Sequence, residues 1–151
     1  MNESKSEFQL PGSAMEELAE ADCLERLSVS HLGRIAFFAR GRPEIFPVNY
    51  AFKSGTVVLR TAPGTKLSEA PGSHVAFEID EYDPESGVGW SVIVHGRARE
   101  VTNEADDFSW AARGAHVTPL APGEKSRRLA IEAEAVSGRR FRRMISEQYL
   151  G

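Results

Sequence analysis

The chain of 151 residues has a single cysteine, Cys23, so it can form no internal disulfide and no cysteine-based metal cluster. Such cysteine use fits a reducing compartment, and we expect a cytoplasmic protein. No stretch approaches the roughly 18 apolar residues that span a bilayer, so we expect no membrane partner. An excess of basic residues is also absent. The 18 Lys and Arg against 22 Asp and Glu leave a net charge of −4, which argues against non-specific nucleic-acid binding.

Sequence motifs for several catalytic classes are missing as well. There is no GxxxxGK(S/T) phosphate loop, no HExxH zinc motif and no GxSxG nucleophile elbow. The four histidines lack metal-ligand spacing, and we interpret them as surface or hydrogen-bonded residues: His31, His74, His95 and His116. We therefore nominate no catalytic side chain and no metal ligand.

Short stretches of alternating apolar and polar residues dominate the chain, and they are typical of strands joined by tight turns. We expect one domain over 15–142, after a flexible segment 1–14 and before a tail 143–151. A helix should start near Asp22, a second should cover 104–114, and one or two helical turns should form at 66–70. The predicted strands are 34–40, 45–52, 56–61, 74–80, 90–101 and 127–136.

Six strands without a βαβ rhythm predict a mainly β (α+β) fold, namely a six-stranded antiparallel barrel with small peripheral helices. In the last strand a helix is the competing structure, because its Glu and Ala residues favour one. As a strand, it would place four apolar residues on one face: Leu129, Ile131, Ala133 and Ala135.

The segment RTAPGTKL, from Arg60 to Leu67, carries the clearest candidate site. A predicted strand ends in Arg60 and Thr61, a Pro-Gly turn follows, and Thr65 and Lys66 open a short helix. Backbone N–H groups at a helix start and an Arg guanidinium both bind phosphate oxygens. The same pattern also describes an ordinary strand-to-helix turn with exposed bases, and the residues alone leave both interpretations open.

Two further segments allow two interpretations each. Pro47 cannot donate to a strand ladder, so Pro47–Tyr50 either belongs to an edge strand or lies where the ladder opens for a flat ligand. The residues alone favour the edge strand. Trp90, which begins a strand with Ser91, is more often a core residue than a cofactor wall.

Charge is unevenly spread along the chain. Residues 1–22 carry six acids against one base, a sum of −5. From Lys125 onward, seven bases against three acids give a sum of +4. Two interpretations are open. Both charged ends are simply exposed to solvent, or the basic end faces an anion.

Taken in order, five segments make the chain resemble the pyridoxamine 5′-phosphate oxidase-like flavoproteins, the FMN-binding split β-barrels. The segments are LGRIAF, RPEIFPVNYAF, LRTAPGTKL, HVAFEIDEYDPESGVGWSVIVHGRAREV and SGRRF. The likeness runs from about Ala21 to Phe141. It is strongest to a small subgroup, common in actinobacteria, that includes the nitroimidazole-resistance reductases. It depends on the order and spacing of the segments, since no single motif is specific.

The resemblance implies a six-stranded split barrel that forms a two-fold homodimer, with FMN in grooves between the subunits. Along the isoalloxazine edge it would place Pro47, Val48, Asn49 and Tyr50. At the ribityl chain and phosphate it would place Arg60, Thr61, Thr65, Lys66 and Leu67. Trp90 and Ser91 would approach the ring from the other subunit, and Arg139 would be a basic residue near the cofactor.

The resemblance also limits the function. True pyridoxamine-phosphate oxidases are longer and bind their substrate with C-terminal Arg and His residues that have no counterpart here, so vitamin B6 oxidation is not expected. We expect an FMN-dependent oxidoreductase that passes hydride or electrons between a small-molecule donor and acceptor. A non-catalytic carrier is the alternative function, and F420 and haem are the alternative cofactors. The net negative charge disfavours a nucleic-acid-binding barrel.

Overall fold

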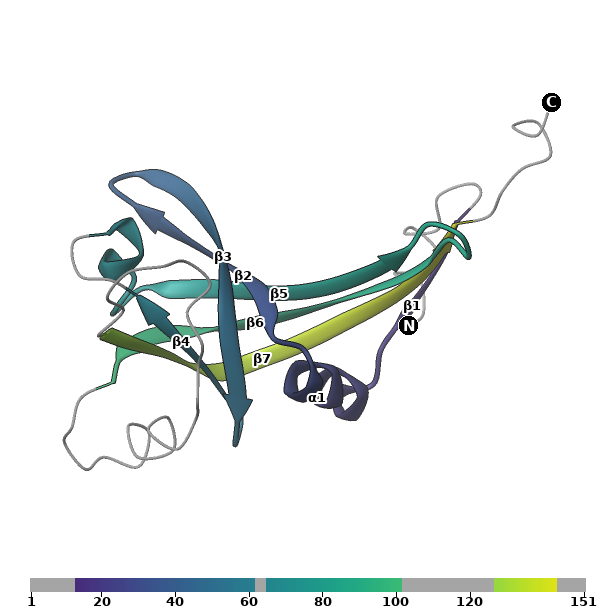
Figure 1. Ribbon diagram of the computed structural model, residues 1–151, viewed down its shortest axis with the longest axis horizontal. Helices are drawn as coiled ribbons and strands as arrows, with labels where there is room; N and C mark the ends of the chain where they lie inside the picture. Colours follow the sequence, from purple (N-terminus) through teal and green to yellow (C-terminus); the bar gives the residue numbers. More distant parts are fainter. Residues whose placement is uncertain (1–12, 62–64, 102–126, 144–151) are drawn as a thin grey trace, which may run out of the picture.

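The computed structural model describes residues 13–61, 65–101 and 127–143, which form one antiparallel sheet with a small helix against it (Figure 1). The helices are α1 (Glu20–Val29) and the 3-10 helix η2 (Lys66–Glu69). The strands are β1 (Ser13–Glu17), β2 (Leu32–Ala39), β3 (Arg42–Lys53), β4 (Thr56–Thr61), β5 (His74–Asp83), β6 (Val88–Glu100) and β7 (Arg127–Arg143).

The sheet closes on itself to form the barrel. Its strand order is β1-β7-β4-β3-β2-β5-β6, and β6 also pairs with β7. The predicted mainly β, antiparallel architecture is confirmed, with seven strands in place of six. The additional strand, β1, pairs with the end of β7 from Ser13 opposite Arg143 to Glu17 opposite Arg139. The helix predicted over 104–114 lies outside the described residues.

Tight turns join β2 to β3 and β3 to β4. Arg40 and Gly41 have φ values of 54° and 77°, and Ser54 and Gly55 have φ values of 52° and 78°. Two successive positive φ angles are typical of the type I′ turns that suit the twist of antiparallel hairpins. The predicted strands 34–40 and 45–52 leave residues 41–44 for the first turn, but β3 already begins at Arg42.

A buried tyrosine joins α1 to the barrel. The Tyr50 hydroxyl donates a hydrogen bond of 2.7 Å to the carbonyl oxygen of Leu27, and the Tyr50 ring meets Phe77 edge-on at 4.7 Å. Burial raises the pKa of Tyr50 to about 12, so the hydroxyl is protonated and donates at neutral pH. The end of α1 is thereby held against the core.

A β-bulge in β7 reverses which residues face the core. Leu129 and Ile131 are buried, and the same alternation would turn Ala135 inward. However, β6 pairs His95 with Ala135 and Gly96 with Ala133, so Glu134 is an extra residue in β7. The prediction that Ala135 shares the inner face is therefore wrong, and Ala135 is exposed.

Three long strands reach beyond the barrel as an arm (Figure 1). The ends of β5, β6 and β7 form it, with β1 along the free edge of β7. Among the described residues, no helix is long and apolar enough to cross a membrane. The arm places the far end of β7 well away from the barrel strands β2, β3 and β4.

We expect Tyr50→Phe to lower the free energy of unfolding by about 1–3 kcal/mol, because the buried carbonyl of Leu27 would lose its donor. Urea denaturation followed by circular dichroism measures this loss. Tyr82→Phe, at an exposed position, is the matched control.

The contribution of Tyr50 to the free energy of unfolding of the wild-type protein should also depend on pH. Because the pKa rises from 10 to about 12 on folding, the stabilisation is complete below pH 10 and declines as the pH rises towards 12. Tyr50→Phe should flatten this alkaline decline, and an unchanged pH profile would contradict the assignment.

Candidate functional site

The barrel opens between β3 and β4. The ladder between these strands ends at the pair of Tyr50 with Leu59, and Asn49 and Arg60 are the next residues along each strand. Pro47 lies in the part of β3 that pairs with β2, opposite Arg34, but has no partner on β4. A proline is tolerated there because no donor is required on that side.

Strand alternation divides the predicted site residues of β3 into two pairs. Val48 and Tyr50 face inward, with only 6% and 3% of their surfaces exposed. Their side chains belong to the core, so they can offer a ligand only main-chain groups. Pro47 and Asn49 face outward on the opposite side of the sheet. Of the predicted segment, these two residues are the ones whose side chains border the opening.

Arg60 is the most unusual residue of the opening. Its Nε atom is buried and has no hydrogen-bond partner among the described residues. A buried unpaired donor on a charged group costs free energy unless a ligand satisfies it, so Arg60 fits an anion. Thr61 follows as the last residue of β4, opposite Arg127.

The short helix η2 follows the opening and places one cation beside it. Thr65 occupies its N-cap position without a side-chain cap hydrogen bond, and the Lys66 Nζ lies 3.0 Å from the Glu44 carboxylate. The charge of Lys66 is therefore already balanced. Leu67 is buried in the core, so its side chain is not available to a ligand.

The remaining predicted residues lie at the start of β6 and at the far end of β7, which pair with each other. Ser91 pairs with Arg139, and their side chains share the outer face. Trp90 faces inward, where the Arg26 guanidinium lies 4.6 Å from its ring centroid. Arg139 is 11 positions from Arg128, roughly 35 Å along the strand, so one chain does not bring Arg60 and Arg139 together.

One residue of the opening was not singled out from the sequence. Arg128 pairs directly with Arg60 across the β4–β7 ladder, so the two side chains lie on the same outer face. The neighbouring pair on that face is Val58 with Ala130, both fully buried. The basic end of the chain gave a signal, but only the strand register distinguishes Arg128 from the other arginines.

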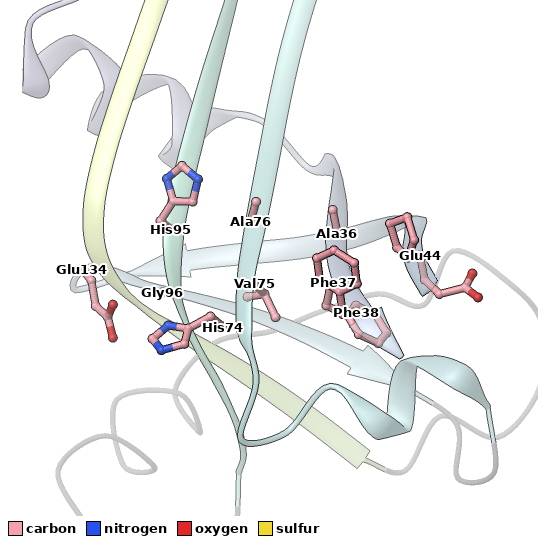
Figure 2. Close-up of a pocket in the computed structure, with 11 residues that line it drawn as sticks. Ala36, Phe37, Phe38, Glu44, His74, Val75, Ala76, His95, Gly96 and Glu134 are labelled. Carbon is pink, nitrogen blue, oxygen red and sulfur yellow. The ribbon is translucent and has the colours of Figure 1, made fainter. Parts of the chain in front are cut away.

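A separate hollow lies on the outer face of β2, β5 and β6 (Figure 2). It has a volume of about 350 Å³, and none of the predicted site residues lines it. Small side chains such as Ala36 and Ala76 form its floor, with Phe38 and the imidazoles of His74 and His95 around them. The His74 Nε2 accepts a hydrogen bond of 3.1 Å from the Arg97 guanidinium. No group of three metal-ligating side chains occurs in the described part of the chain.

Comparisons with known proteins give a consistent result. Residues 19–140 match the family model described as pyridoxamine 5′-phosphate oxidase. The Mycobacterium tuberculosis protein Rv0080 is 35% identical over 139 residues, covering 87% of this chain and 90% of that protein.

Two solved structures extend the comparison. The FAD binding protein from Mycobacterium smegmatis is 32% identical, with a TM-score of 0.64 over 85% of this chain and 100% of that one. A candidate pyridoxamine 5′-phosphate oxidase from Corynebacterium glutamicum is 30% identical, with a TM-score of 0.68 over 87% and 96%.

Removing the carboxylate that balances Lys66 should strengthen anion binding at the opening. We expect Glu44→Gln to raise the affinity for inorganic phosphate roughly two- to fivefold, because the freed ammonium could turn to the anion. The shift in melting temperature across a phosphate titration at constant ionic strength measures it.

Glu69→Gln is the matched control, because it removes an equal charge near Lys66, from the short helix η2, but releases Arg40 on the exposed surface instead. Equal gains in both variants would indicate only a change in net charge.

Proposed function

The chain belongs to the pyridoxamine 5′-phosphate oxidase family, and from this premise we propose that it is a flavin-dependent oxidoreductase. The observation that carries the proposal is the buried, unpaired Nε of Arg60 at the opening between β3 and β4. A flavin phosphate would supply the missing acceptor. A bound flavin supplies hydride and electron transfer itself, so the chain needs to provide only binding, orientation and electrostatics.

The residues around the opening would divide this work. Arg60 would hold the phosphate through its planar guanidinium. Lys66 and Thr65, at the start of η2, would border the same anion, and Thr61 would lie between them and Arg60 along the chain. Asn49 and the main-chain groups near Pro47, which have no partner on β4, would provide hydrogen bonds to the polar edge of the ring. The inward side chains of Val48, Tyr50 and Leu67 would support these positions from the core.

We propose FMN as the flavin, since Arg60 and its surroundings offer a site for one terminal phosphate. FAD is the alternative, because a relative of 32% identity is an FAD binding protein. The nucleotide released from the purified protein by heating, identified by chromatography, distinguishes them.

The flavin proposal predicts a yellow protein, or one that takes up added FMN with a change in its visible spectrum. We expect Arg60→Gln combined with Lys66→Gln to weaken FMN binding at least tenfold, because the phosphate loses the Arg60 guanidinium and the Lys66 ammonium can no longer turn from Glu44 towards it. Lys53→Gln, in the turn at the other end of β3, is the control. A colourless wild-type protein that ignores added FMN would refute the proposal.

Turnover is a separate measurement. The flavin-loaded protein should be reduced by a nicotinamide or deazaflavin donor and reoxidised by a quinone faster than an equal concentration of free flavin. Retention of flavin without such a gain would favour the non-catalytic carrier function.

We also propose that the working unit is a homodimer. Ser91 on β6 and its partner Arg139 on β7 lie too far along the β6–β7 ladder to reach a flavin held at Arg60 of the same chain. A second copy could supply them, because the arm projects away from its own barrel (Figure 1). Exposed apolar residues on the outer faces of β2 and β3 support pairing, since Phe38 is 72% and Ile45 63% exposed.

A mixed dimer tests this arrangement. Arg60→Gln and Arg139→Gln should each weaken FMN binding in homodimers. When the two variants are co-expressed with different tags and purified as a mixed dimer, one of its two sites regains both arginines. We expect about half of the sites to bind FMN with wild-type affinity. A mixed dimer as weak as both parents would show that the arginines serve a site within one chain, or none.

A further inference from the structure

The outer face of the β4–β7 ladder holds two arginines in direct opposition. Arg60 and Arg128 are register partners, and residues that lie opposite each other in an antiparallel pair have Cβ atoms about 4.5–5.5 Å apart. Like charges in this arrangement destabilise a sheet. An anion bound between the two guanidinium groups would therefore stabilise the pair.

The described part of the chain provides no such anion. Neither Arg60 nor Arg128 forms an ion pair with a described carboxylate, and the Arg60 Nε has no hydrogen-bond partner in the same part of the chain. Two other arginines of the barrel do have carboxylate partners. Arg34 contacts Glu78 at 3.1 Å, and Arg40 contacts Glu69 at 2.9 Å. The opposed pair thus lacks the described carboxylate partners that Arg34 and Arg40 have, although the net charge of the chain is −4.

The charges around the opening indicate which ligand Arg60 and Arg128 could bind. Lys66 is already neutralised by Glu44, so the opening's uncompensated positive charge resides on Arg60 and Arg128. A phosphate monoester carries a charge of about −1.5 to −2 at pH 7, close to the sum of two guanidinium groups. Two planar forks on one face can bind several of its oxygens at once.

We propose that Arg128 is a second phosphate-binding residue, which forms a two-arginine clamp with Arg60 and makes the site selective for the phosphorylated form of the flavin. This inference rests on the proposed function. The clamp discriminates by charge, so an uncharged analogue such as riboflavin gains nothing from Arg128.

The test compares Arg128→Gln with Arg97→Gln. Arg97 lies on the neighbouring strand β6, opposite Glu132 of β7, and contacts His74, so it serves as a charge-matched control. The dissociation constants of FMN and riboflavin are measured by quenching of flavin fluorescence. We expect Arg128→Gln to weaken FMN binding about tenfold or more and to leave riboflavin binding unchanged. Arg97→Gln should change neither.

Two results would overturn the clamp: an unchanged FMN affinity in Arg128→Gln, or an equal loss of FMN and riboflavin, which would indicate damage to the fold. Arg128→Lys adds a geometric readout, because it retains the charge but not the fork. It should recover only part of the FMN affinity.

A readout without flavin separates this inference from the proposed function. Inorganic phosphate should raise the melting temperature of the wild-type chain, and Arg128→Gln should reduce that shift. If this result holds while the wild-type chain binds no flavin, the flavin function fails and the clamp stands. If phosphate does not stabilise the wild-type chain, the clamp is refuted.

Discussion

The structure depends on one strand, β7, that is hydrogen-bonded to three others. Along one edge β7 pairs with β6, and along the other it pairs first with β4 and then with β1. This double pairing closes the barrel and continues it into the arm. It buries Leu129 and Ile131, each worth roughly 1.5–3 kcal/mol of hydrophobic stabilisation. It also sets Arg128 opposite Arg60 and Arg139 opposite Ser91, so the strand that completes the core positions the polar residues of both ends.

A second constraint is the local distribution of charge, which the net charge hides. The chain is acidic as a whole, yet its barrel opening holds two arginines without carboxylate partners among the described residues. The nearby lysine is neutralised by a residue from the start of β3. Screening by solvent weakens exposed pairs such as Arg40 with Glu69, but a buried guanidinium nitrogen has no such relief. The local charge at the opening is therefore positive and suited to an anion.

Sequence reasoning reached the architecture and the opening because both leave local signals. The alternation of apolar and polar residues indicated the strands. Pro47 cannot donate a hydrogen bond to a neighbouring strand, and Arg60 is a cation at the end of a strand, just before a Pro-Gly turn. The pairing of Lys66 with Glu44 could not be foreseen, because it joins residues 22 positions apart. Tyr50 and Leu67 fell into the predicted site although their side chains complete the core, since sequence order does not say which face a residue adopts. Arg128 required the register of β4 with β7.

The extra residue in β7 has a consequence for how this chain can vary. Arg128 and Arg139 are an odd number of positions apart, so in a regular strand they would point to opposite faces. The bulge at Glu134 restores a common face, because it adds one residue that has no partner on β6. If the chain lost this one residue, one of the two arginines would face the inner side of the sheet. Insertions and deletions here are thus restricted to even numbers, although Glu134 itself is exposed and free to change in identity.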